Sequence, residues 1–411
     1  MKHILVISQY FYPEQFRIND ICTEWVKRGY KVTVLTGIPN YPYGKYFKGY
    51  GVFKKRKEQY NGMKIIRIPI IPRGKNSIMM ILNYISFVIC GFFWKLFTKV
   101  KADIVFIFEV SPMTQALPGV WYAKRRKIPC FLYVQDLWPE NVEIITGISN
   151  KLVINSIGKM VDNIYKNCDQ IFTTSESFTH SIKNRGVDKN KIVFWPQYAE
   201  DIFKPISCTP IDEIPNNGAL NAIFAGNIGK AQGLELLPKV AKRLKDLNHK
   251  KDIVFNIVGD GRYKEELIQT VNNLNVNNYF NFISRQPQER IPAFYSSCNI
   301  GLLCLNDNPI FKMTIPAKLQ TYLASGLPIF ASASGEVKKI IKDSNAGICV
   351  YPGDVDSFCE ELINYSRLEN SQIETYASNA RNYYLRNFNK SDLLDIMDSY
   401  IKKFTKDKNY V

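Results

Sequence analysis

The residues best suited to chemistry lie in TIPAKLQTYLASGLPIF, residues 314–330. This stretch predicts a polar loop, a helix capped by Thr314 with Pro316 in its first turn, and an apolar strand after a Gly-Pro turn. The first turn of a helix offers unpaired backbone N–H groups and a partial positive charge, and Lys318 adds a full charge. These features together predict a binding site for the diphosphate of a nucleotide.

A second candidate for phosphate binding is FAGNIGKAQG, residues 224–233, which follows an apolar run. Its glycines let a phosphate approach the backbone closely, and Lys230 supplies a compensating charge. The spacing differs from G-x-x-x-x-G-K-[ST], so the P-loop interpretation fails. Taken alone, the pattern also fits a glycine turn that packs a strand against a helix.

The first half of the chain holds two polar and aromatic loops. In QDLWPEN, residues 135–141, Asp136 and Glu140 are suited to orienting sugar hydroxyls, and Trp138 is suited to stacking on a sugar ring. The other loop, YFYPEQFRIND, occupies residues 10–20 after the first apolar run. In open α/β sheets such loops line the ligand site.

The remaining polar motifs do not predict a metal site. In VGDGRYKEEL, residues 258–267, Asp260 fits a helix cap and a ligand contact equally well. One D-x-D pair, Asp354 and Asp356, follows a Pro-Gly turn and precedes an amphipathic stretch, so capping is its predicted role. The three histidines form no metal-ligand spacing and no triad, and we expect no required metal.

The elements that position these motifs are predicted to alternate between strands and helices. Apolar runs in the first half lie at 3–8, 31–37, 64–70, 103–109, 129–136, 170–177 and 192–197. A proline-containing linker is predicted at 200–220. The runs then resume at 221–229, 252–261, 280–286, 299–305, 328–333 and 347–354. This order predicts an α/β fold with two Rossmann-like, doubly wound domains that face a cleft.

Charge and cysteine content narrow the class of protein. The chain of 411 residues has a net charge of +17, and residues 1–100 carry 17 Lys+Arg against 4 Asp+Glu. This excess fits an anionic lipid surface, a polyphosphate ligand or a solubilising surface. No zinc-finger or RNA-binding signature is visible, so nucleic acid is not an expected partner.

The cysteines indicate the compartment. The nine cysteines form no C-x-x-C pair, and we expect reduced thiols in the cytoplasm. We also expect no signal peptide.

One apolar segment, residues 77–94, does not fit the alternating pattern. It contains no charged residue, and the cations around it are Arg73, Lys75, Lys95, Lys99 and Lys101. A membrane span needs roughly 20 apolar residues, so the segment is marginal as a span. We expect a helix at an anionic membrane surface, and the alternative is a helix buried in the fold.

The motifs at 10–20, 135–141, 224–233 and 314–329 together resemble a retaining, two-domain glycosyltransferase of the family 4 type, with the GT-B fold. The resemblance runs across residues 4–355. It is strongest to the bacterial O-antigen and capsule branch that includes N-acetyl-L-fucosaminyl transferases.

The resemblance implies transfer of a sugar, for example N-acetyl-L-fucosamine, from a UDP-linked donor to a lipid-diphosphate-linked saccharide. We expect a peripheral location on the inner face of the bacterial plasma membrane, and, from the residues themselves, no metal cofactor. Residues 1–200 would bind the acceptor, and residues 219–390 would bind the nucleotide sugar. A last helix within 391–411 would cross back to the first domain.

Individual roles follow from the positions of the motifs. The expected catalytic residues are Lys230, Lys318 and Asp136. The expected donor-binding residues are Gly226, Asn227, Gly229, Asp260, Arg285, Thr314, Ile315, Pro316 and Gln320. The expected acceptor-binding residues are Tyr12, Glu14, Arg17, Asn19, Trp138 and Glu140.

The chain departs from the family pattern at several positions. The family usually carries two glutamates separated by seven residues, where this chain has Lys312 and Gln320. Gln320 can hydrogen-bond ribose hydroxyls but cannot act as a carboxylate. A His–Asp pair common in the acceptor domain corresponds here to Gln135–Asp136.

Two alternatives compete with a glycosyltransferase. A nucleotide-sugar epimerase of similar architecture needs acid and base groups, and the scarcity of histidines and paired carboxylates counts against it. A non-catalytic glycan- or lipid-binding protein fits the missing glutamates. The phosphate-binding features favour the transferase.

Overall fold

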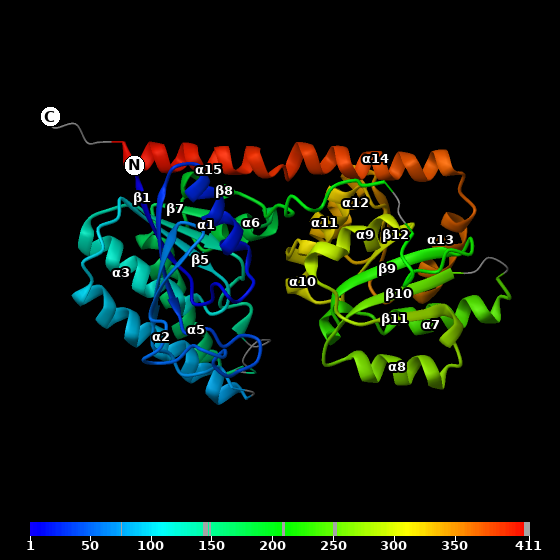
Figure 1. Ribbon diagram of the computed structural model, residues 1–411, viewed down its shortest axis with the longest axis horizontal. Helices are drawn as coiled ribbons and strands as arrows, with labels where there is room; N and C mark the ends of the chain where they lie inside the picture. Colours follow the sequence, from blue (N-terminus) through cyan, green and yellow to red (C-terminus); the bar gives the residue numbers. More distant parts are fainter. Residues whose placement is uncertain (75, 143–146, 148, 208–209, 250–252, 407–411) are drawn as a thin grey trace. The chain divides into compact units, whose positions relative to one another are not determined.

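The computed structural model folds into two compact α/β units (Figure 1). Unit 1 comprises Met1–Pro196 together with the chain from Leu394 onward, and unit 2 comprises Gln197–Leu393. The residues that the structure describes are 1–74, 76–142, 147, 149–207, 210–249 and 253–406.

Unit 1 is built on an eight-stranded sheet with the order β3-β4-β2-β1-β5-β6-β7-β8. Its strands are β1 (His3–Ile7), β2 (Lys31–Gly37), β3 (Lys57–Tyr60), β4 (Met63–Ile68), β5 (Ile104–Glu109), β6 (Cys130–Val134), β7 (Gln170–Thr173) and β8 (Ile192–Phe194). All neighbouring strands pair in parallel except β3, which pairs antiparallel with β4. Sequence reasoning missed β3 because its side chains alternate between exposed and half-buried positions and form no apolar run.

Unit 2 is built on a six-stranded parallel sheet with the order β11-β10-β9-β12-β13-β14. Its strands are β9 (Leu220–Asn227), β10 (Ile253–Asp260), β11 (Phe280–Ile283), β12 (Ile300–Cys304), β13 (Ile329–Ser332) and β14 (Gly347–Val350). Each lies within or beside an apolar run that predicted a strand. The predicted α/β fold is therefore confirmed.

Helices surround both sheets. In unit 1 they are α1 (Arg17–Lys27), α2 (Ser77–Phe97), α3 (Ala116–Arg126), α5 (Lys151–Asn167) and α6 (Glu176–Asn184). In unit 2 they are α7 (Leu236–Asp246), α8 (Lys264–Asn273), α9 (Ile291–Ser296), α10 (Pro309–Met313), α11 (Ala317–Ser325), α12 (Glu336–Ser344), α13 (Val355–Ser366) and α14 (Asn370–Asn387). The last helix, α15 (Lys390–Thr405), begins in unit 2 and continues into unit 1.

The core of unit 2 shows why its strands are apolar throughout. Ala222 and Phe224 of β9 belong to one buried cluster, whereas the alternating Ile223 and Ala225 belong to another. Both faces of the sheet are therefore covered, as parallel sheets require.

The chain between the two sheets belongs to unit 2 by its contacts. The hydroxyl of Tyr384 in α14 accepts from the backbone N–H of Ala199 and donates to its carbonyl. The carboxylate of Glu213 pairs with Arg290 at 2.8 Å. The predicted linker is thus fixed at several points, and the division between the units falls at Pro196.

From Leu394 onward, α15 packs within unit 1. Arg28 pairs with Asp395 at 2.5 Å and with Asp398 at 2.7 Å. The ring of Phe404 lies edge-on to Phe131 of β6, with centroids 5.2 Å apart.

Candidate active site

Lys318 joins the two predicted phosphate-binding motifs. It stands in the first turn of α11, and its Nζ donates to Oε1 of Gln232 at 2.6 Å. The same Nζ lies 4.1 Å from the ring centroid of Phe224. A Cβ atom at Gly226 would come within 3.2 Å of this Nζ, so glycine keeps the space beside the cation open. The glycine turn after β9 and the start of α11 therefore form one cationic site at the carboxyl end of the sheet.

The surroundings of Lys318 lower the pKa of its ammonium group. Burial lowers its pKa from 10.5 to about 8, because the interior disfavours the charged form. A diphosphate placed beside the ammonium group would favour the charged form again. Binding of such an anion should therefore be coupled to protonation of Lys318.

This coupling predicts a pH dependence of UDP binding. Free Lys318 loses its proton as the pH rises through about 8, so UDP then has to bind together with a proton. We expect the Kd for UDP to rise about tenfold for each pH unit above this value. Isothermal titration calorimetry measures it, and Lys318→Met should bind UDP weakly with little pH dependence. A constant Kd for the native protein across this interval contradicts the assignment.

Lys230 lies in the same glycine turn but is more exposed. Its side chain is 75% exposed, and its Nζ pairs with Glu266 of α8 at 3.1 Å. Its carbonyl accepts a hydrogen bond of 2.8 Å from the side chain of Asn306, which follows β12. The backbone of the turn is thus fixed, while the cation can exchange Glu266 for another anion. Asn306 was not among the predicted site residues, and its position after an apolar run is the signal that identifies it.

The turn after β10 packs against the turn after β9. Gly259 has a φ of +148°, and a Cβ atom there would lie 2.0 Å from the carbonyl oxygen of Gly226. Asp260 is exposed, and its carboxylate accepts from the backbone N–H of Gly261 at 3.0 Å. Because the N-cap of α8 is Tyr263, the helix-cap interpretation of Asp260 is wrong.

The remaining donor residues predicted around these turns are near the surface. Asn227 ends β9 and is exposed, and its carbonyl accepts from the N–H of Gly229 at 3.1 Å. Arg285 is exposed in the segment after β11. Their contacts with a donor stay predictions.

The start of α11 differs from the prediction in its capping. Thr314 is the C-cap of α10, and its hydroxyl donates to the carbonyl of Ile310 at 2.9 Å instead of capping α11. The N-cap is Pro316, and among the described residues no side chain caps this end of α11. The correction arises because the short α10 was not predicted. The N–H of Leu319 donates to the carbonyl of Pro316 at 2.9 Å, and those of Ala317 and Lys318 are left to face an anion.

Gln320 is positioned by the interior of unit 2. It is 1% exposed, and its Nε2 donates to the carbonyl of Gln197 at 2.6 Å. The predicted ribose contact is therefore not supported, because the amide faces the chain that enters unit 2. Ile315, in the segment before α11, is buried as well. Lys312 pairs with Asp307 at 2.7 Å.

In unit 1, Asp136 is held at the ends of two neighbouring strands. Asp136 follows β6, and Ser111 follows β5. The carboxylate of Asp136 accepts hydrogen bonds from the N–H of Ser111 at 2.8 Å and from its hydroxyl at 2.7 Å. The indole of Trp138 donates to the same hydroxyl at 3.2 Å. Trp138 is only 3% exposed, so the predicted stacking on a sugar is wrong and its ring positions Ser111 instead.

A second carboxyl group lies behind Asp136. Glu109 ends β5 and is fully buried, and burial followed by the nearby charge of Asp136 raises its pKa well above the usual range. Burial and the neighbouring carboxylate thus both favour the protonated form of Glu109. Sequence reasoning missed it because it ends an apolar strand without any flanking motif. Glu140 is exposed and accepts a long hydrogen bond of 3.5 Å from Ser181.

The loop at 10–20 is braced by its own polar side chains. Glu14 accepts backbone hydrogen bonds from Phe11, Asn40 and Tyr41 at 3.1, 2.8 and 2.7 Å. It is 3% exposed, and burial raises its pKa to about 7. The predicted contact of Glu14 with an acceptor is therefore wrong, because its carboxylate braces its own loop at Phe11 and ties that loop to Asn40 and Tyr41.

Three further residues of this loop, all predicted to bind the acceptor, differ in what the structure shows. Asn19 accepts from the N–H of Tyr12 at 3.3 Å and donates to the carbonyl of Glu14 at 2.7 Å, so it is a brace as well. The ring of Tyr12 stacks on Tyr60 with centroids 3.8 Å apart. Arg17 is half-buried in the first turn of α1, and its acceptor contact stays a prediction.

We expect Glu14→Ala to destabilise unit 1 by about 3 kcal/mol, since three N–H groups, two of them buried, would lose their acceptor. Glu14→Gln keeps one acceptor oxygen and should have about half of this effect. Thermal unfolding followed by circular dichroism measures both. Unfolding midpoints equal to that of the native protein would show that the bonds do not stabilise the loop.

Neither metal ligands nor the surface pocket of α5 adds to this site. Among the described residues, no group of three or more His, Cys, Asp or Glu side chains is arranged to hold a metal ion.

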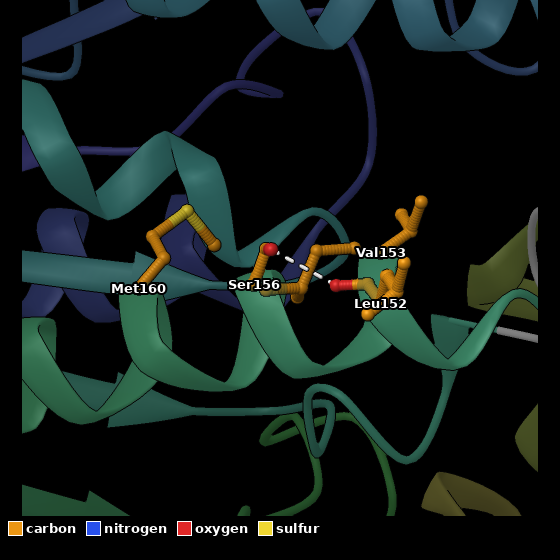
Figure 2. A pocket seen from close by; sticks show the side chains of 5 residues that line it. Leu152, Val153, Ser156 and Met160 are labelled. Carbon is orange, nitrogen blue, oxygen red and sulfur yellow. Dashed lines mark hydrogen bonds between the residues drawn. The ribbon is translucent and has the colours of Figure 1, made fainter.

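A pocket of about 390 Å³ lies on α5, lined by Leu152, Val153, Ser156, Ile157 and Met160 (Figure 2). Its only side-chain polar group, the hydroxyl of Ser156, donates to the carbonyl of Leu152 at 2.9 Å. The lining offers no charge to bind a phosphate.

Comparison with known proteins defines the class. Residues 212–383 match the family model described as Glycosyl transferases group 1, and residues 16–197 match the model described as Glycosyltransferase Family 4. The chain is a glycosyltransferase with the GT-B fold. It is 24% identical over 374 residues to WcaI of Escherichia coli (strain K12), named as a glycosyl transferase of colanic acid biosynthesis. The match covers 86% of this chain and 89% of WcaI.

Solved structures agree on the fold. Sucrose-phosphate synthase from Thermosynechococcus elongatus is similar with a TM-score of 0.73 and 15% identity, over 98% of this chain and 99% of that one. Anabaena Alr3699/HepE in complex with UDP and glucose is similar with a TM-score of 0.70 and 14% identity, over 98% and 100% of the two chains.

Proposed function

We propose that this glycosyltransferase moves a sugar from a UDP-linked donor to a lipid-diphosphate-linked saccharide, with retention of anomeric configuration, in the synthesis of a bacterial surface polysaccharide. The observation that carries the proposal is the site formed by Lys318, Gln232 and Gly226 in unit 2. The structural neighbour Alr3699/HepE was solved with UDP and glucose, and WcaI is named for colanic acid biosynthesis. Both names support a nucleotide-sugar donor and a polysaccharide product.

The donor site is suited to stabilising the leaving group. When the bond between the sugar and the diphosphate breaks, negative charge develops on the phosphate oxygens. Lys318, Lys230 and the first-turn N–H groups of α11 are the donors that would stabilise this charge. Because Lys318 is half-buried, its charge acts where water screens it poorly.

Retention fits a site without a strong side-chain base. In a front-face substitution, the departing phosphate oxygen can accept the proton of the attacking hydroxyl. Asp136 would then orient that hydroxyl, and its own position is fixed by two hydrogen bonds from Ser111. No step in this scheme needs a metal, so we propose transfer without one.

The location proposed is the inner face of the plasma membrane. The eight cysteines that the structure describes are all free thiols, which is typical of a reducing compartment. A lipid-diphosphate-linked acceptor would be reached at that membrane surface.

A panel of UDP-sugars, including UDP-N-acetyl-L-fucosamine, tests the proposal with a lipid-diphosphate-linked saccharide as acceptor. We expect one UDP-sugar to be transferred, and the new linkage should keep the anomeric configuration of the donor by NMR. An inverted product would contradict retention. Transfer only from sugars linked to other nucleotides would contradict the UDP donor.

A further inference from the structure

Helix α2 presents apolar side chains on two opposite sides. Its inner side packs against unit 1 through Met80, Asn83, Tyr84, Phe87 and Gly91. A Cβ atom at Gly91 would lie 2.4 Å from the ring of Pro118 in α3, so the two helices pack closely. This side accounts for only part of the apolar surface of the helix.

The outer side of α2 is a continuous apolar stripe. Its residues recur at intervals of three and four, which places them along one face of the helix. They are Ile78, Leu82, Ile85, Ile89, Phe92, Phe93, Leu96 and Phe97. Ile78 is 70% exposed, Phe93 55% and Phe97 78%. A soluble surface rarely leaves so many large apolar side chains together in water, so this stripe needs a partner.

The inner contacts argue against a membrane crossing by α2. The helix has 21 residues and is apolar enough to span a bilayer. However, the side chain of Asn83 accepts from Gln9 at 2.7 Å and donates to the carbonyl of Ile71 at 2.5 Å. The inner side of α2 is thus bonded to the rest of unit 1 through buried polar contacts, and only the outer side is exposed.

The carboxyl end of α2 is strongly cationic. Arg125 at the end of α3 donates to the carbonyls of Lys95 and Leu96, at 2.6 and 2.9 Å, which holds the two helix ends together. The cations at or just after the carboxyl ends of α2 and α3 are Lys95, Lys99, Lys101, Lys124, Arg125, Arg126 and Lys127. Residues 71–102 and 110–129 contain no Asp or Glu. All of these cations except Lys95 are exposed.

An apolar stripe beside exposed cations, without acids, matches an anionic lipid surface. Apolar side chains would enter the boundary between headgroups and acyl chains, and the cations would contact the phosphates of the headgroups. The same face of a second copy would bring only further cations, because residues 71–102 and 110–129 contain no acid. Charge therefore favours lipid over self-association.

We propose that unit 1 binds anionic membrane lipid through the outer stripe of α2 and the cations at the ends of α2 and α3. This binding deepens the proposed function, since it would hold the enzyme where a lipid-linked acceptor is anchored. It does not depend on the identity of the donor sugar.

Vesicle sedimentation at low salt tests the proposal with the full chain. Native protein should sediment with phosphatidylglycerol vesicles and much less with phosphatidylcholine vesicles. Ile89→Asp/Phe93→Asp should lower the partition coefficient at least about tenfold. Lys99→Glu/Lys124→Glu/Lys127→Glu should lower binding to phosphatidylglycerol at least about tenfold, and high salt should weaken native binding.

The control Leu247→Asp/Leu385→Asp removes two exposed apolar side chains from unit 2 and should bind vesicles as the native protein does. UDP binding by each variant shows that unit 2 is intact, and circular dichroism reports folding. Transfer to a water-soluble acceptor should be unchanged in the α2 variant, so failure of membrane binding is distinguished from failure of the proposed function. Native sedimentation that vesicles do not change overturns the proposal. So does a native dimer that Ile89→Asp/Phe93→Asp dissociates without lipid.

Discussion

Lys318→Met should lower kcat/KM for the UDP-sugar by about 1,000-fold, the largest effect that we expect from a single substitution. The half-buried ammonium group lies beside Gly226, where the diphosphate is proposed to bind, and methionine keeps its length without its charge. The ammonium charge of Lys318 stabilises the negative charge that develops on the leaving diphosphate. Because this happens in the transition state, most of the loss should be in kcat. Steady-state kinetics with saturating acceptor measures the effect.

The matched control is Lys242→Met, which removes an exposed lysine of α7 that pairs with Asp246 at 2.5 Å. This control should keep native kinetics. A Lys318→Met variant that folds normally and retains more than about a tenth of native kcat/KM would contradict the leaving-group role.

Lys230→Ala should lower kcat/KM by about 100-fold. Its side chain is exposed, and its ion pair with Glu266 is the kind that contributes little to stability, so folding should be unaffected. The expected loss thus reflects the missing contact with the diphosphate and not a change in the turn. Steady-state kinetics and UDP titration measure it, with Lys242→Ala as the control. Near-native sugar transfer by Lys230→Ala would refute the phosphate role.

The positions of most strands along the chain were predictable because buried parallel strands are continuous apolar runs. HILVI of β1, for instance, is buried at every position. The exposed edge strand β3 has no such run and was missed. The boundary between the units was less predictable, since prolines between 200 and 220 suggest a linker but side chains such as Glu213 tie this segment to unit 2.

The candidate site was predictable where its chemistry depends on local sequence. Glycine turns and a lysine in a helix start identified the two motifs that Lys318 joins. Roles that depend on side-chain direction were not predictable. Trp138 and Glu14 turn into the fold, and sequence alone does not distinguish a buried polar brace from a ligand contact. Glu109 was missed for the same reason, because only the sheet brings it near Asp136.

The most direct test of the proposed reaction is UDP release from a UDP-sugar with and without a lipid-diphosphate-linked saccharide. We expect release to depend on the acceptor, to match the amount of extended saccharide and to be lost in Lys318→Met. Conversion of the donor to an epimeric UDP-sugar at the same rate without acceptor would contradict sugar transfer. So would UDP-sugar binding without any consumption of the donor across the panel.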